Sequence, residues 1–167
     1  MRPRLTLILS TICYLGVISG LHAETFRNDH GGMIGVYLDR FAELSLTEKR
    51  VVVEGTCLSA CTLMLGMIPR ARICANRGAQ FGFHAAWMLD SKNRAVPSPE
   101  GTRKLMEVYP EDVRRMIAQR GGLKQSMFYV PASTFVADCA DASRERAHAS
   151  VKDSNKRKMR RAYAHGR

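Results

Sequence analysis

The chain has 167 residues, of which 46% are hydrophobic and 25% charged, and its formal net charge is +11 at pH 7. Without the first 23 residues, 144 remain, which is enough for one ordinary domain with its own core, and we expect no second domain. No G-x-x-x-x-G-K-[ST] stretch occurs in the sequence, so we expect no ATP site, and we expect no other cofactor.

The N-terminal residues have the pattern of a secretory signal peptide. Two arginines precede an apolar run over residues 5–21, and the small residue Ala23 follows this run. The pattern predicts a signal peptide over residues 1–23, cut after Ala23, and export to the periplasm or the medium. An uncleaved anchor is the alternative, because the run approaches the roughly 17 residues of the shortest spanning helices, but it contains three hydroxyl residues and lacks a basic far flank.

The first half of the mature chain predicts an extended segment, a helix, a buried strand and a second helix. Apolar residues recur at helical spacing from Ile34 to Leu44, with charged residues on the other side. The β-branched run that follows is typical of a buried parallel strand, which we expect Gly55 to end, and Pro69 ends the second helix. The predicted ranges are 24–28, 33–45, 51–53 and 60–67.

The second half predicts two short strands, a polar surface loop over residues 90–99 and two helices. Ser98 is followed by Pro99, the pattern of a helix start, and Gly121 and Gly122 end the last helix. The predicted strands cover 72–74 and 80–84, and the helices begin at Pro99 and Pro110. The alternation of elements indicates an α/β layered fold with a mostly parallel sheet and flanking helices, over residues 24–141.

Residues 142–167 form a basic tail, with nine Lys or Arg residues and two acidic residues. Almost no apolar periodicity runs through this segment, so we expect it to bury too little surface to order itself and to be a disordered tail. Its functional interpretation is contact with anionic surfaces, and we expect no nucleic acid partner.

Four cysteines remain after removal of the leader, namely Cys57, Cys61, Cys74 and Cys139. An even number in an exported chain predicts one or two disulfides, and the sequence leaves the pairing open. The alternative is a zinc site of Cys57, Cys61, Cys74 and His84, which the spacing and the export signal disfavour, so we expect no metal.

The stretch GTCLSACTLMLG places Ser59 at a predicted turn between a strand and a helix. Such turns project a serine outward, and the free N–H groups at the helix start can receive the negative charge of an oxyanion. The glycines that flank the serine in ordinary α/β-hydrolases are replaced here by Cys57 and Cys61. The alternative is that Ser59 is a helix N-cap in a turn held by disulfides.

Three segments together resemble the Clp-protease-like branch of the crotonase superfold. They are NDHGG at 28–32, VVVEGTCLSAC at 51–61 and FGFHAAW at 81–87, and the pattern is similar to that of small secreted bacterial proteins. The resemblance implies that Ser59 is the nucleophile and that His84, 25 residues later, is the base. It also implies that Gly31, Gly32 and Ala60 form the oxyanion site, through the N–H groups of Gly32 and Ala60.

The third member of a catalytic triad has no matching residue. Clp-type enzymes carry an aspartate in a later helical region, and the loosely corresponding stretch here, AQRGG at 118–122, contains none. Asp138 and Asp112 are the two candidates for an acid that orients His84. Loss of this acid lowers the rate by several powers of ten when the wrong imidazole tautomer results.

The sequence therefore predicts a secreted serine hydrolase that acts on a peptide or other acyl substrate, through Ser59 and His84. The alternative is a non-catalytic periplasmic binding or scaffold protein on the same fold. Because relatives of this superfold form rings or trimers, the resemblance also implies a homo-oligomer.

Overall fold

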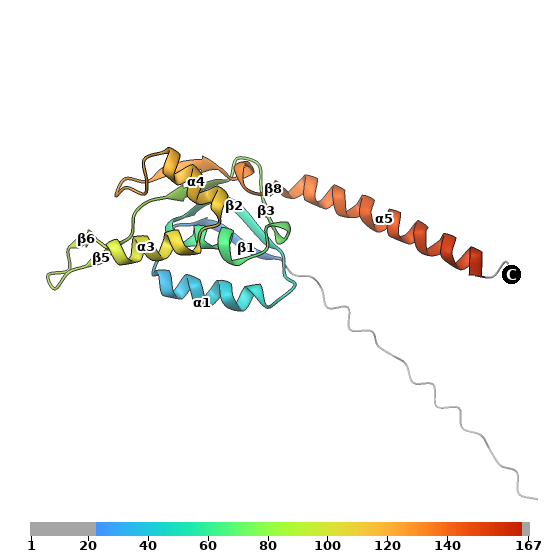
Figure 1. Cartoon of the computed structure of the whole chain (residues 1–167), viewed down its shortest axis with the longest axis horizontal. Helices are drawn as coiled ribbons and strands as arrows, with labels where there is room; N and C mark the ends of the chain where they lie inside the picture. Colours follow the sequence, from blue (N-terminus) through green and yellow to red (C-terminus); the bar gives the residue numbers. More distant parts are fainter. Residues whose placement is uncertain (1–22, 165–167) are drawn as a thin grey trace, which may run out of the picture.

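Strand β2 (Val51–Leu58) is the centre of the sheet in the computed structural model, which describes residues 23–164 (Figure 1). β1 (Glu24–Asp29) pairs with one edge of β2 in parallel. β3 (Ile73–Ala75) pairs with the first half of the other edge and β4 (Gln80–Phe83) with its second half, both in parallel. The predictions can thus be compared with the structure over residues 23–164. The signal peptide predicted over residues 1–23 lies, except for Ala23, outside the described part, as do residues 165–167.

Two strands that the sequence did not predict complete the sheet. β7 (Phe128–Pro131) pairs with β4 in antiparallel orientation, and β8 (Ala137–Asp138) pairs with β3 in parallel. The strand order is β7, β4, β2, β3, β8, with β1 attached to β2. The α/β prediction is confirmed, and the sheet is mixed because of β7.

β2 continues through Gly55, where the sequence predicted its end. Gly55 has a φ of +73°, and a Cβ atom there would lie 2.0 Å from the Oδ1 atom of Asn28. The Thr56 N–H donates to this same oxygen at 3.2 Å, at a point where the register between β1 and β2 shifts. The Asn28 amide therefore fills the gap in the ladder, so that the glycine bends the strand instead of ending it.

The predicted helices are confirmed at their predicted places. α1 covers Ile34–Ser45 and buries Phe41 and Leu44, and the Ser98 hydroxyl accepts the Gly101 N–H at the start of α3. The predicted helix over residues 60–67 begins as a 3-10 helix. The remaining bounds are η1 (Ser59–Leu63), α2 (Met64–Met67), η2 (Arg70–Arg72), α3 (Pro99–Val108), α4 (Glu111–Gln119) and η3 (Ala132–Thr134).

The polar loop predicted over residues 90–99 is wrong, because this region contains half of a hairpin. β5 (Trp87–Leu89) and β6 (Ala95–Pro97) form a two-stranded antiparallel sheet that projects from the domain (Figure 1). The Asp90 carboxylate closes the turn by accepting the N–H groups of Lys92 and Arg94 at 2.8 and 2.9 Å. Each strand has three residues without an alternating pattern, and β6 contains a proline, so the sequence could not reveal them.

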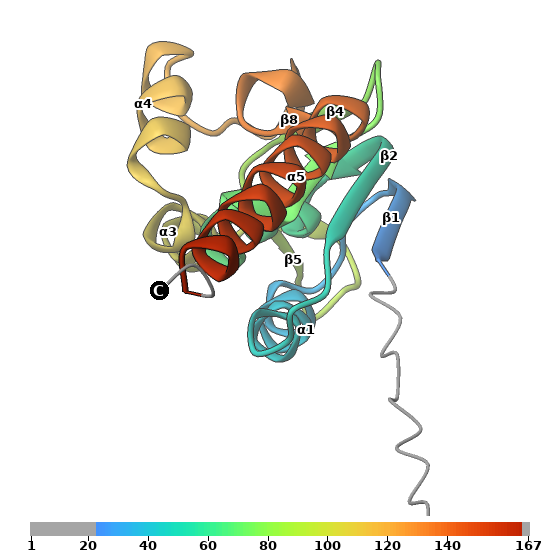
Figure 2. The same cartoon turned by 90° about the vertical axis from the view of Figure 1, so that its right-hand side faces the viewer.

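The core is built from aromatic residues of the sheet and the helices around it. Phe81 and Phe83 are fully buried on β4, and the ring of Phe83 lies 5.7 Å from that of Tyr109 at the end of α3. Trp87 on β5 is 54% exposed and takes no part in this core. Figure 2 shows α3 and α4 at the opposite side of the domain from β1.

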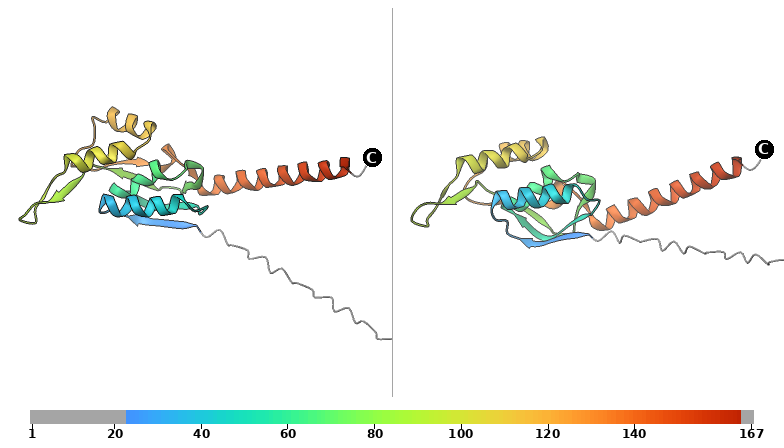
Figure 3. Two further views of the ribbon diagram at one scale, coloured as in Figure 1. Left: turned by 60° about the horizontal axis from the view of Figure 1, so that its bottom comes forward. Right: turned by 90° about the horizontal axis from the view of Figure 1, so that it is seen from below.

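The basic tail is helical where the sequence predicted disorder. α5 (Cys139–Ala164) has 26 residues and runs away from the domain (Figures 1 and 3). Alanine, lysine and arginine favour a helix without burial, and Arg157 pairs with Asp153 one turn earlier at 2.7 Å. The sequence argument considered burial alone and therefore missed these local terms.

Candidate active site

Ser59 and His84 follow the carboxyl ends of two neighbouring parallel strands. Leu58, the last residue of β2, pairs with Gly82 of β4. Ser59 comes directly after Leu58, and His84 comes two residues after Gly82. Because the ends of parallel neighbours meet at one edge of a sheet, the fold brings these two residues to the same edge.

The Gly31–Gly32 segment reaches this edge from the other side of β2. A Cβ atom on Gly31 would lie 2.8 Å from the Cβ of Ser59, 2.5 Å from the carbonyl oxygen of Leu58 and 3.0 Å from the nitrogen of Ala60. Gly31 also has a φ of +76°, in the left-handed region that favours glycine. The contact therefore requires glycine at position 31, and it places the segment against the Ser59 turn.

The Asp29 carboxylate holds the glycine segment. Its Oδ1 atom accepts the Gly31 N–H at 2.8 Å and also the hydroxyl of Tyr37 from α1. Burial raises the pKa of Tyr37 to about 12, and the hydrogen bond and negative charge of Asp29 add to this shift. The N–H of Gly32, which is exposed, has no hydrogen-bond partner within residues 23–164. It is thus a donor available to a ligand.

Ser59 has a backbone conformation that is rare for a residue with a side chain. Its φ is +54°, in the left-handed region, where such residues occur mostly at turns and functional sites. The N-cap of η1 is Leu58, and Ser59 is the first helical residue. The Ser59 hydroxyl makes no hydrogen bond to any described residue, so the structure gives the N-cap interpretation no support. The N–H groups of Ser59 and Ala60 precede the first hydrogen bonds within η1.

A disulfide and a buried hydroxyl pair fix this turn. The disulfide between Cys57 and Cys61, here called the short disulfide, brackets Ser59 and joins Cα atoms 5.4 Å apart. The Thr62 hydroxyl donates to the Ser59 carbonyl at 2.6 Å, so it must accept its other hydrogen bond, at 2.6 Å, from the Tyr109 hydroxyl. Burial raises the pKa of Tyr109 to about 12, which keeps this phenol protonated as the donor.

Thr62 and Tyr109 were missed by sequence reasoning. A threonine three residues after Ser59 is suited to donate to its carbonyl, so Thr62 could have been found from its spacing. Tyr109 lies 47 residues further along the chain, and no local pattern links it to the turn. The second disulfide, between Cys74 and Cys139, is here called the long disulfide and ties α5 to β3.

His84 is half-buried and its ring is oriented by a backbone carbonyl. The Nδ1 atom lies 2.7 Å from the carbonyl oxygen of Ala85. Because a carbonyl only accepts, Nδ1 carries the hydrogen in this bond, and the neutral ring then has its lone pair on Nε2. This is the tautomer that a general base requires for a serine hydroxyl.

Neither candidate acid contacts His84. Asp138 lies on β8, paired with Ala75, and its carboxylate accepts the Ala140 N–H at 2.8 Å at the start of α5. It also lines a pocket of about 260 Å³ that includes Gln80, at the end of β4 opposite to His84. The structure therefore does not bring Asp138 together with Ser59 and His84.

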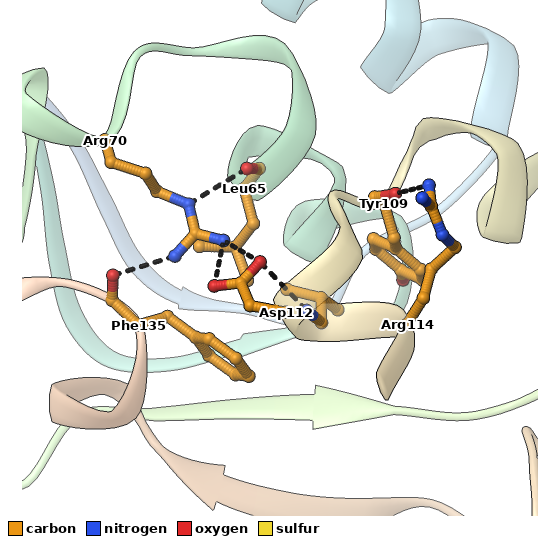
Figure 4. A network of polar contacts seen from close by, with 7 residues as sticks. Leu65, Arg70, Tyr109, Asp112, Arg114 and Phe135 are labelled. Carbon is orange, nitrogen blue, oxygen red and sulfur yellow. Dashed lines mark hydrogen bonds and ion pairs between the residues drawn. The ribbon is translucent and has the colours of Figure 1, made fainter. Parts of the chain in front are cut away.

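Asp112 belongs to a separate polar network (Figure 4). Its carboxylate oxygens lie 3.1 and 3.2 Å from the Arg70 guanidinium, which also donates to the carbonyls of Leu65 and Phe135 at 3.0 and 2.7 Å. This network joins α2, α4 and the segment after β7. Its role is to hold these elements together, and it leaves no carboxylate oxygen directed at His84.

Both disulfides bear on the zinc alternative and on the compartment. Each of the three cysteines in that ligand set is disulfide-bonded, so its sulfur is not a thiolate that could bind zinc. Two disulfides fit an extracellular or periplasmic protein, as predicted. Within residues 23–164, no helix combines the length and apolarity needed to cross a membrane.

Comparison with protein-family models gives no match for this chain, and comparison with curated proteins gives none either.

Proposed function

We propose that this protein is a serine hydrolase of the Clp-like type, which transfers an acyl group from a peptide or other acyl substrate to Ser59 and then to water. The observation that carries the proposal is the conformation of Ser59. Its φ lies in the left-handed region, and its hydroxyl makes no hydrogen bond to any described residue. Ser59 follows the end of β2, and His84 follows the end of the neighbouring strand β4. The order of glycine pair, serine and histidine along three parallel strands supports a Clp/crotonase-like fold.

The residues at this edge can perform each proton transfer of the reaction. The Ser59 Oγ atom attacks the substrate carbonyl and gives its proton to Nε2 of His84. The N–H groups of Ala60 and Gly32 donate to the oxyanion that forms. His84 then returns the proton to the leaving group, whose bond to the carbonyl carbon breaks and leaves an acyl group on Ser59. Attack by a water molecule, deprotonated by His84, releases the acid and restores the serine.

The group that orients the His84 ring determines how fast we expect hydrolysis to be. A carbonyl, here that of Ala85, fixes the tautomer of His84 as a carboxylate would, but it carries no full charge to stabilise the imidazolium. We therefore propose a slow hydrolase.

A second candidate function, ligand binding without catalysis, is supported by the lack of a carboxylate beside His84 among the described residues. Within residues 23–164, the only hydrogen bond of the His84 ring is to Ala85. A non-catalytic binding protein would retain the Gly32 donor and the serine turn for ligand recognition and would need no acid.

Turnover of p-nitrophenyl acetate separates the two candidates. We expect the disulfide-bonded wild type to release p-nitrophenol with a burst, and Ser59→Ala and His84→Ala to lack it. Ser133→Ala, which removes an exposed serine on η3, is the matched control and retains the burst. Equal release by the wild type and Ser59→Ala would contradict hydrolysis and favour the binding function.

A further inference from the structure

The strongest charged surface outside the candidate active site is on α5. Over residues 149–160, all side chains are exposed, and five of these residues are Lys or Arg while one is acidic. The acidic residue, Asp153, pairs with Arg157, whose side chain is still 77% exposed. A helix with this composition has no core-facing stripe, and its stability depends on local pairs.

Three of the five basic residues in this range lie on one side of the helix, whereas Lys158 lies about 200° from Lys156 around the axis. Lys152, Lys156 and Arg160 follow each other at four-residue spacing, so they form one ridge, and Arg157 lies about 100° from Lys156 around the axis. We call Lys152, Lys156 and Arg160 the basic ridge. The uncharged residues Val151, Asn155 and Met159 occupy a different part of the circumference.

The composition argues against a protein helix as the occupant of this surface. Val151 and Met159 are the only large apolar residues in the range 149–160, and they are eight residues apart. A helical partner needs apolar residues every three or four positions. A second copy of α5 would also be repelled by its like charge. The complement of the basic ridge is therefore an extended anionic surface.

The position of α5 leaves it free to reach such a surface. The long disulfide fixes its first residue to β3, and its main contacts with the domain are with β3 and β8 at its beginning. The helix is about 39 Å long by its 26 residues. It leaves the domain at the end opposite to the β5–β6 hairpin, which directly follows the His84 segment (Figures 1 and 3).

We propose that α5 docks the protein on an anionic phospholipid membrane surface, with the basic ridge against the phosphate headgroups. Two disulfides indicate an oxidising compartment. In such a compartment nucleic acid is scarce, and the phosphate headgroups of membrane lipids form the main anionic surface. This inference does not depend on the proposed hydrolase activity.

Sedimentation with vesicles tests this docking. The full disulfide-bonded protein is mixed with vesicles of phosphatidylglycerol and phosphatidylcholine, or of phosphatidylcholine alone. We expect binding only to the anionic vesicles and a strong decrease in high salt, which screens charge. Each Lys or Arg at the surface contributes roughly a fivefold factor, so replacing the basic ridge by glutamine should weaken binding roughly a hundredfold.

The matched control removes three other exposed cations. Lys49, Arg77 and Lys92 lie on the domain, and no ion pair involves them within the described part of the chain. Their replacement by glutamine gives the same net charge as the ridge variant and should leave binding nearly unchanged. Equal loss in both variants, or binding of the wild type to neither vesicle, would overturn the proposal. Duplex DNA bound by the wild type in place of the anionic vesicles would overturn it as well.

Discussion

The buried phenol of Tyr109 should make the stability of the protein fall at alkaline pH. Tyr109 is 1% exposed, and burial raises its pKa from 10.0 to about 12. Because the folded state holds this proton more tightly, its contribution is complete below pH 10 and is lost as the pH rises towards 12. A shift of two units corresponds to about 3 kcal/mol of unfolding free energy.

Tyr109→Phe should separate this effect from the hydrogen bond to Thr62. At neutral pH the variant loses the bond that Tyr109 donates, so its unfolding free energy should fall by about 1 kcal/mol. The variant has no titrating phenol at position 109, so its stability should equal that of the wild type at about pH 11 and exceed it at higher pH. Urea unfolding at each pH measures both curves, with Tyr129→Phe as the control for loss of an exposed phenol. Curves that stay parallel from pH 7 to 12 would refute the reasoning.

The remaining predictions concern the disulfides and the glycine beside Ser59. Replacing both cysteines of the long disulfide, which are 65 residues apart, by alanine should lower the unfolding free energy by about 4 kcal/mol. The same change in the short disulfide, whose cysteines are 4 residues apart, should lower it by about 2 kcal/mol. Urea unfolding of the two variants measures both values. Gly31→Ala should destabilise the protein by clearly more than Gly78→Ala, because Gly78 has a similar φ of +82° but open space at its Cβ position. Equal losses in the two glycine variants would show that the close approach of Gly31 to the Ser59 turn is absent.

Periodic elements were the part of the fold that could be predicted from sequence. α1, α3 and α4 have apolar residues at helical spacing and clear start and stop signals, and each lies where the pattern predicted it. The short strands β5 to β8, of two to four residues each, show no alternation of apolar and polar residues and were not predicted. Their places are set by partners far along the chain.

Part of the candidate site could be predicted from the sequence, and part depends on the folded chain. Ser59, His84 and the glycine pair lie in recognisable segments, and the parallel register of β1, β2 and β4 brings those segments to one edge. The orienting group of His84 could not be predicted, because a backbone carbonyl has no sequence signature. The search for a carboxylate therefore named Asp138, which the fold places at the other end of β4. The pairing of the cysteines was likewise a property of the folded chain.

Labelling with a fluorophosphonate tests most directly whether Ser59 is an activated nucleophile. The wild type is compared with Ser59→Ala, His84→Ala and the control Ser133→Ala, all with intact disulfides and equal folded yield. The account predicts one adduct on the peptide that contains Ser59 in the wild type and the control, and none in the other two variants. A folded wild type that stays unlabelled, or labelling that persists in Ser59→Ala, would contradict it.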